Sequence, residues 1–199
     1  MPKVAVTTEY AAPKADVKVL NEKPKAKAAL QKECGWPLEP KCPVICIPSG
    51  MTKDLGGKLF EQLLPGLLSL EVEVLILGKG SSSYGSFITG LAEEQNHRIA
   101  IIPNKPAAIE KMFKAADMAL FFSDPASLPE LSECLGQGTV PICPQTKAVS
   151  NYNPVQESGN AFLYNKDNEW QCFAAIVRAL ETHVFPFDWK TIQKHCLDT

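Results

Sequence analysis

The sequence has only three histidines, and none of its seven cysteines forms a Cys-x-x-Cys pair. A structural zinc site needs four closely spaced ligands of these types, so we expect no metal site and assign no cofactor. Two of the cysteines, Cys46 and Cys143, fall inside apolar runs, where cysteine behaves as a small hydrophobic residue. An odd number of cysteines used in this way favours free thiols in a reducing compartment.

The sequence also has no apolar run of membrane-spanning length and no large excess of basic residues. Its N-terminus has no signal-peptide h-region, and its net charge is -2 with a pI of about 6.0. We therefore expect neither a membrane nor a nucleic acid as a partner. The first 30 residues are locally basic, and we interpret their lysines as a solvated tail and helix face.

Short apolar runs recur at regular intervals and predict six β-strands. Most runs are continuous rather than alternating, which is typical of strands buried on both faces. They cover residues 44–47, 72–77, 99–102, 118–122, 140–143 and 161–164. Helical patterns cover residues 58–70, 83–95, 107–116, 128–136 and 168–183, and a last helix begins at 188 or 189. This alternation predicts an α/β fold with a doubly wound parallel sheet of six strands.

The N-terminal segment is predicted to lie outside the sheet. Residues 1–22 show neither a helical nor a strand period, and we interpret them as an extended N-terminal arm or linker. A helix is predicted over residues 23–35, with Pro24 in its first turn and Gly35 at its end. Residues 23–199 then form the folded domain.

Ligands of doubly wound sheets bind beyond the carboxyl ends of the strands, near the switch in strand order, so the loops after the strands are candidates. After the first strand, Gly56 and Gly57 open a helix and could let a phosphate approach backbone amides, with Lys53 adding a positive charge. The spacing fits no known phosphate-binding motif, and a turn that only needs glycine geometry is an equal alternative. In the loop at 77–83 we favour turn geometry and helix capping.

The loops after the fourth and fifth strands supply the other candidates. Ser127 and Glu130 fit a capping box at a helix start, which is the role we favour for both. Asp124 could bind ribose hydroxyls or serve acid–base chemistry, against the simpler interpretation of a solvated surface. Thr146 and Lys147 lie in a long loop and are candidate phosphate contacts, with a plain surface loop as the alternative.

Several segments resemble bacterial glycogen synthases and plant starch synthases, and the resemblance runs from about Lys25 to Leu197. The matching segments are 25–35, 72–80, 115–118, 159–162 and 138–141, the last of which is the family's usual Gly-Thr-Val-Pro. The resemblance implies the C-terminal, nucleotide-sugar-binding domain, a Rossmann-like half of a GT-B glycosyltransferase. It also implies ADP-glucose or UDP-glucose as the ligand and α-1,4-glucan elongation as the ancestral reaction.

Several residues that this family uses to hold its donor are missing. Gly50 and Leu55 stand where the family has an arginine and a lysine that grip the diphosphate, with Lys53 as a displaced substitute. The family's Glu-Pro-Cys-Gly-Leu becomes 125–129, so its glutamate is lost unless Asp124 serves. Its Thr-Gly-Gly becomes Thr-Lys-Ala at 146–148. Each lost charge-assisted hydrogen bond removes about 1.5–3 kcal/mol of binding.

Three interpretations stay open. The chain could be half of an enzyme that transfers glucose when paired with a separate N-terminal glycosyltransferase domain. It could be a non-catalytic pseudo-enzyme that binds, scaffolds or regulates, or an unrelated doubly wound module of the flavodoxin type. The missing basic residues favour the pseudo-enzyme for this chain alone, and we predict no glucosyl transfer by it in isolation. We expect it in the cytoplasm, or alternatively in the plastid stroma.

Overall fold

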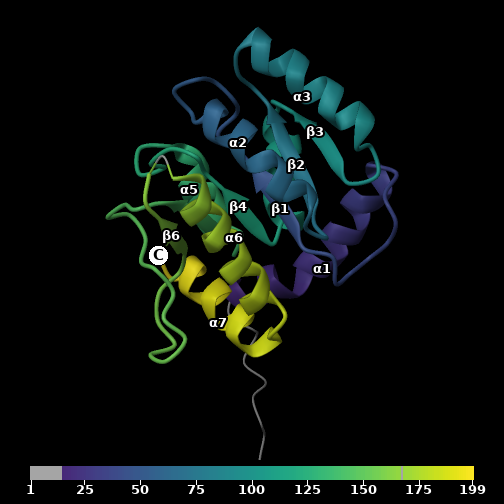
Figure 1. Ribbon diagram of the computed structural model, residues 1–199. Helices are drawn as coiled ribbons and strands as arrows, with labels where there is room; N and C mark the ends of the chain where they lie inside the picture. The colour runs from purple at the N-terminus through teal and green to yellow at the C-terminus, as the bar shows by residue number, and fades with distance from the viewer. Residues whose placement is uncertain (1–14, 167) are drawn as a thin grey trace, which may run out of the picture.

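A computed structural model describes residues 15–166 and 168–199, and its centre is a parallel six-stranded sheet between two layers of helices (Figure 1). The strands are β1 (Val44–Ile47), β2 (Glu73–Gly78), β3 (Ile99–Pro103), β4 (Met118–Leu120), β5 (Val140–Pro144) and β6 (Phe162–Tyr164). Their order is β3-β2-β1-β4-β5-β6, and every neighbouring pair is parallel. The predicted doubly wound sheet of six strands is confirmed.

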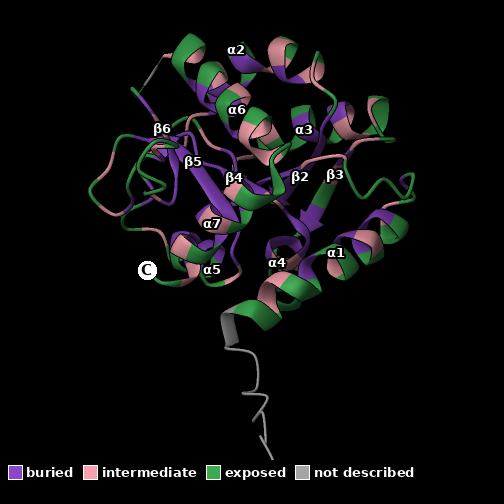
Figure 2. Ribbon diagram, turned by 90° about the horizontal axis from the view of Figure 1, so that it is seen from below, coloured by how far each residue is buried: buried purple, intermediate pink, exposed green. Residues whose placement is uncertain are grey.

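The helices follow the predicted pattern with small shifts at their ends. They are α1 (Ala15–Glu33), α2 (Gly57–Leu68), α3 (Ser82–Glu94), α4 (Pro106–Ala115), α5 (Pro129–Gly136), α6 (Glu169–His183) and α7 (Pro186–Leu197). Helices α2, α3 and α6 cover one face of the sheet, and α1, α4, α5 and α7 cover the other (Figure 2). None of the helices in the described part of the chain is long and apolar enough to cross a membrane.

The centre of the sheet lies between β1 and β4, where the direction of strand addition reverses. Strands β2 and β3 extend the sheet on one side of β1, and β4, β5 and β6 extend it on the other. The side chains of Ile45, Cys46 and Ile47 are fully buried there, as their continuous apolar run predicts. All seven cysteines are free thiols, and burial raises the pKa of Cys46 to about 12.

Because β1 and β4 are parallel, the loops that follow them leave the same edge of the sheet, which we call the carboxyl edge.

Helix α1 begins at Ala15 rather than at Lys23, so the predicted extended arm is wrong for residues 15–22. These residues stay out of the sheet, as predicted, while residues 1–14 lie outside the described part of the chain. Pro24, expected in the first turn, lies inside the helix and interrupts its hydrogen bonding. A proline there costs about 3 kcal/mol, so contacts elsewhere on the helix must hold it in place.

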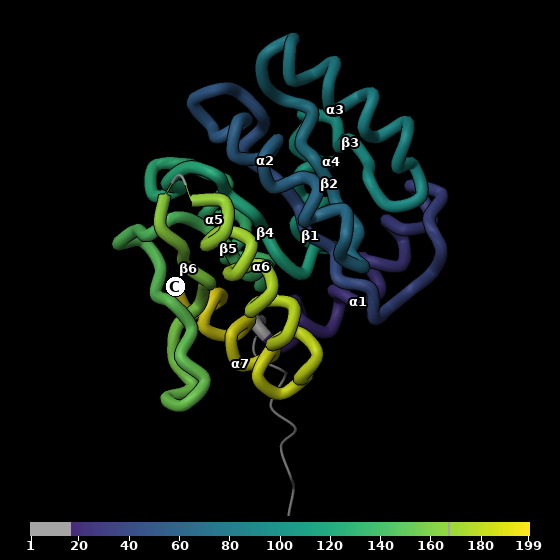
Figure 3. The backbone as a smooth tube through the Cα atoms, in the orientation of Figure 1, coloured from purple at the N-terminus to yellow at the C-terminus, as the bar shows by residue number. Residues whose placement is uncertain are grey.

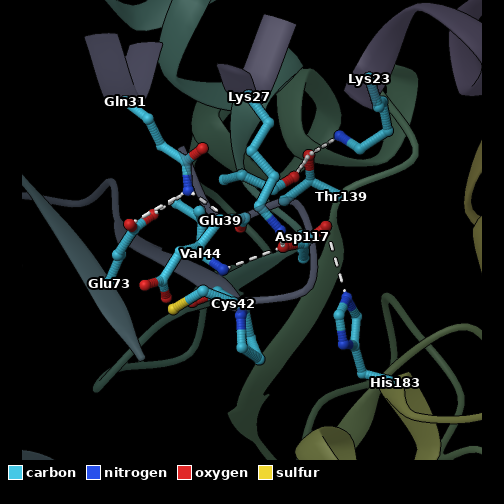
Figure 4. Close-up of polar contacts among 12 residues, drawn as sticks. Lys23, Lys27, Gln31, Glu39, Cys42, Val44, Glu73, Asp117, Thr139 and His183 are labelled. Carbon is cyan, nitrogen blue, oxygen red and sulfur yellow. Dashed lines mark hydrogen bonds and ion pairs between the residues drawn. The ribbon is translucent and has the colours of Figure 1, made fainter. Parts of the chain in front are cut away.

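Those contacts come from polar side chains spaced four residues apart on one face of α1 (Figure 4). The Lys23 ammonium donates to the carbonyls of Phe113 (3.0 Å) and Gln137 (3.1 Å) and to Oγ1 of Thr139 (3.0 Å). Burial lowers the pKa of Lys23 from 10.5 to about 8, against the opposing charge of Asp117. The solvated helix face predicted for these lysines is therefore wrong at Lys23, which is 6% exposed, because its donors are all satisfied inside the protein.

Asp117 joins α1 to three other parts of the fold at the edge where the strands begin, the amino edge. Its Oδ2 accepts from the Lys27 ammonium (2.8 Å) and from the backbone N–H of Val44 (2.9 Å), and its Oδ1 lies 3.6 Å from Nε2 of His183. Burial alone would raise the pKa of Asp117, but His183 and Lys27 outweigh it and lower the pKa to about 2. Further along α1, the Gln31 amide donates to the Glu73 carboxylate at 2.8 Å.

The loop between β5 and β6 projects from the body of the domain (Figure 3). Residues Asn153 and Ser158 form an antiparallel bridge within it, so that its tip folds back as a small hairpin. Its two ends are tied together, since Tyr152 N–H donates to the Ala161 carbonyl at 2.7 Å. The two ends of the projecting loop are therefore held together by backbone hydrogen bonds.

Candidate functional site

The predicted site residues gather at the carboxyl edge of the three strands β1, β4 and β5. Lys53, Gly56 and Gly57 follow β1, Asp124, Ser127 and Glu130 follow β4, and Thr146 and Lys147 follow β5. The reversal in strand order lies between β1 and β4, which is where doubly wound sheets bind their ligands. The roles of these residues stay predictions, and their local contacts describe what each could do.

The loop after β1 is fastened to the loop after β2 by backbone hydrogen bonds. Met51 N–H donates to the Lys79 carbonyl (2.8 Å), and Ser81 N–H donates to the Met51 carbonyl (3.1 Å). Next to them, Gly50 has a φ of 76°, and a Cβ added to it would lie 2.5 Å from the Lys79 carbonyl oxygen. An arginine at this position would therefore need both a strained backbone and a displaced neighbour. The observed loop admits only glycine.

Gly56 and Gly57 pack closely against aromatic side chains. Gly56 has a φ of 86°, and a Cβ on it would lie 2.3 Å from Cβ of Phe122. A Cβ on Gly57 would lie 2.2 Å from the Tyr84 ring, and the Gly57 N–H already donates to the Thr52 carbonyl at 2.9 Å. Both glycines therefore have a packing role, which favours the alternative that they serve backbone geometry.

Two further residues of this loop, Lys53 and Leu55, differ in their contacts. Lys53 is exposed, and within the described part of the chain its ammonium has no hydrogen-bond or ion-pair partner. Leu55 is half-buried, and its N–H donates to Oγ1 of Thr52 at 3.1 Å. Lys53 is thus a free charge at the rim of the site rather than a fixed ligand.

The capping box predicted for Ser127 and Glu130 is wrong. Helix α5 starts at Pro129, its N-cap residue is Leu128, and no side chain caps it. Proline fits the first helical position because the missing N–H has no partner there anyway, and this moves the helix start past Ser127. Ser127 is exposed, and Asp124 accepts the N–H of Ala126 at 3.0 Å and so stabilises its own loop.

Glu130 instead forms an ion pair that the sequence did not predict. Its Oε1 lies 3.3 Å from the ammonium of Lys79, the residue that follows β2. The Glu130 side chain is 10% exposed and that of Lys79 is 49% exposed, so the pair closes over the carboxylate and leaves the ammonium open to solvent. Lys79 is thus a basic side chain that an ion pair holds near the carboxyl end of β1.

Thr146 and Lys147 lie apart from the switch point. The Thr146 hydroxyl accepts the N–H of Ala148 at 3.3 Å, so it stabilises its own turn. Lys147 is exposed and borders a cavity of about 270 Å³ whose other lining includes Asn160 and His195. Within the described ranges, 15–166 and 168–199, no group of three or more His, Cys, Asp or Glu side chains could hold a metal ion.

The fold matches the Rossmann-like half of the GT-B glycosyltransferase fold. The catalytic domain of starch synthase IV from Arabidopsis thaliana, solved with ADP and acarbose, has the same fold with a TM-score of 0.78. Its sequence is 17% identical to this chain, and the superposition covers 90% of this chain and 39% of the starch synthase chain. No family model matches the sequence.

Sequence comparison finds glycogen synthases among the relatives of this chain. A glycogen synthase of Clostridium perfringens is 30% identical over 190 residues, which are 92% of this chain and 39% of that enzyme. Glycogen synthase 1 of Synechocystis sp. is 27% identical over 190 residues, which are 92% of this chain and 40% of that enzyme. The chain is homologous to glycogen synthases, corresponds to their C-terminal domain and spans about 40% of their length.

Proposed function

We propose that this chain is a glucan-synthase-type domain that binds a nucleotide sugar weakly at the carboxyl edge of β1 and β4 and transfers no glucose by itself. The ligand class is ADP-glucose or UDP-glucose. Starch synthase IV, which has this fold, was solved with bound ADP, and this supports a nucleoside diphosphate as part of the ligand. We place this function in a reducing compartment, the cytoplasm or the plastid stroma.

The observation that carries this proposal is the conformation of Gly50. The resemblance to glycogen synthases puts a diphosphate-binding arginine at this position, yet the loop is fastened to Lys79 with a positive φ and no room for a Cβ. Leu55, at the expected lysine position, is apolar and half-buried. Negative charge that develops on a leaving diphosphate would meet little support here, and such support is a major part of catalysis.

A second reason for inactivity is geometric. The chain spans about 40% of the glycogen synthases that it matches. The resemblance to GT-B glycosyltransferases implies that donor and acceptor meet in a cleft between two domains. With one domain alone, the acceptor glucan cannot be held against the donor, and the benefit of fixed orientation is lost. All the candidate nucleotide contacts named above lie on this domain, so we expect weak affinity to persist without transfer.

Calorimetry and a transfer assay test the proposal together. The purified chain is titrated with ADP, ADP-glucose and UDP-glucose, and radiolabelled donor is incubated with glycogen. We expect a dissociation constant near the millimolar range and no label in glycogen. Label that appears in glycogen and disappears in Lys53→Ala would overturn the proposal and make Lys53 the displaced basic residue.

The partial coverage of the relatives favours one alternative, a half-enzyme that works with a separate N-terminal glycosyltransferase domain. Such a protein would keep a donor site ready for use. Micromolar affinity for a nucleotide sugar without transfer would therefore support the half-enzyme, whereas millimolar affinity supports a binding, scaffolding or regulatory role. The same titration separates the two.

A further inference from the structure

The Lys79–Glu130 pair crosses the switch point of the sheet. Lys79 follows β2, Glu130 lies in the first turn of α5 after β4, and β1 runs between these two strands. An ion pair of 3.3 Å between them must therefore pass over the carboxyl end of β1. This is the place where a doubly wound sheet receives its ligand.

Lys79 also starts from the space that a side chain at position 50 would enter. A Cβ built on Gly50 would lie 3.1 Å from Cβ of Lys79, and the two backbones are already in contact. The Lys79 side chain thus leaves the backbone close to the point where the side chain of an arginine at position 50 would leave it. Lys53, the substitute suggested by the sequence, has no comparable fixed position.

We infer that Lys79 is the cation that binds the diphosphate of the ligand, and that Glu130 competes with the ligand for it. This inference rests on the proposed nucleotide-sugar site. In the pair, the charge of the ammonium is neutralised by a carboxylate, which would also repel an incoming diphosphate. The Lys79 side chain is 49% exposed and can turn to a ligand, while the Glu130 side chain is only 10% exposed and has less room to move. Nucleotide binding is weak because it must first break this contact.

Substitutions on both sides of the pair test the inference by calorimetry with ADP and with inorganic pyrophosphate. Glu130→Gln keeps the shape but removes the competing charge, and should tighten ADP binding about three- to tenfold. Lys79→Met should weaken it at least as much. Lys105→Met, which removes an exposed lysine that follows β3 at the outer edge of the sheet, is the matched control and should change ADP affinity less than twofold.

The double variant Lys79→Met/Glu130→Gln shows whether the gain acts through Lys79. We expect it to bind ADP no better than Lys79→Met alone, because without the ammonium there is nothing for Glu130 to block. The effect of Glu130→Gln should also shrink as salt is raised, because exposed charges are screened. Thermal unfolding of each variant confirms that it is folded.

The failures are distinguishable. ADP binding by the wild-type chain that neither Lys79→Met nor Glu130→Gln changes would overturn the role of Lys79 and leave the proposed function standing. A Glu130→Gln variant that binds ADP more weakly than the wild type would show that Glu130 supports the ligand and also overturn the inference. Absence of ADP binding in the wild type and in Glu130→Gln at 10 mM nucleotide would overturn both proposals.

Discussion

The two edges of the central sheet use their charged residues in opposite ways. At the amino edge, Lys23 and Lys27 are buried, and Lys23, Lys27 and Asp117 are all held by short hydrogen bonds within the protein. At the carboxyl edge, Lys53 is exposed and unpaired within the described residues, and Lys79 is paired with a carboxylate. The strong electrostatic interactions of this chain thus lie where they fix the fold, and the weak ones lie where we propose that a ligand binds.

The contrast teaches that the residues that fix a fold and the residues of a candidate ligand site can be separate on one chain. A buried charge pair is costly to break, because the partner left behind stays desolvated. An exposed charge can change with little effect on stability. The amino edge is therefore expected to resist substitution, and the carboxyl edge to be free to lose or regain ligand contacts.

The largest effect is expected for Asp117→Ala at the amino edge. It leaves the buried ammonium of Lys27 and the N–H of Val44 without their acceptor, and should lower the free energy of unfolding by about 3–5 kcal/mol. Urea denaturation measures this change. The control is Glu33→Gln, in the same helix as Lys27, whose ion pair with Lys111 is exposed and should contribute nothing measurable. Equal effects of the two substitutions would break the comparison.

Acid should weaken the same network in a predictable range. The pKa of Asp117 is lowered from 3.8 to about 2, so its ionisation stabilises the fold fully above pH 5 and is lost as pH falls toward 2. The contribution is about 2 kcal/mol, and about half of it should be gone at pH 3. Urea denaturation from pH 6 to pH 3 on the wild type and Asp117→Ala isolates it, and a constant difference between the two proteins would contradict the assignment.

At the carboxyl edge, Gly50→Arg should fail to restore a diphosphate site. The positive φ and the contact with Lys79 make the substitution costly, by about 1–3 kcal/mol in the free energy of unfolding. Leu55→Lys, in the same loop but without these constraints, should fold normally and tighten ADP binding about tenfold. Calorimetry and urea denaturation check both, and better ADP binding by Gly50→Arg would show that the loop can rearrange.

The smallest effects concern the helix starts. Ser127→Ala should change the free energy of unfolding by less than about 0.5 kcal/mol, because Ser127 caps no helix. Asn168→Ala should cost about 1 kcal/mol, since the Asn168 side chain accepts the Gln171 N–H at 2.9 Å and caps α6. Thermal or urea denaturation of the two variants decides, and a loss at Ser127 as large as at Asn168 would reinstate the capping box.

The sequence predicted the sheet well because its strands carry their signal locally. Continuous apolar runs such as 44–47 and 140–143 can only be buried on both faces, and the structure places them so. The burial of α1 could not be predicted in the same way. Lys23, Lys27 and Gln31 have helical spacing but no apolar character, so their pattern looks like a solvated face until Asp117, Thr139 and Glu73 are placed opposite them.

The site shows the same limit more sharply. The sequence points to the loops at the carboxyl edge, because a doubly wound sheet binds ligands there, but it did not predict the ion pair of Lys79 with Glu130. The partner of Lys79 lies 51 positions away, and the two meet only because β1 is placed between β2 and β4. Strand order is a property of the whole chain, and no spacing between neighbouring residues reports it.

The four-residue spacing of Lys23, Lys27 and Gln31 gives α1 one more property. Each residue added to a helix turns everything beyond it by about 100°. A single insertion or deletion between Lys23 and Gln31 would thus rotate one of these side chains away from its partner while leaving the amino-acid composition almost unchanged. The helix should tolerate many substitutions on its exposed face, but its length between these positions is fixed by the bonds that they make.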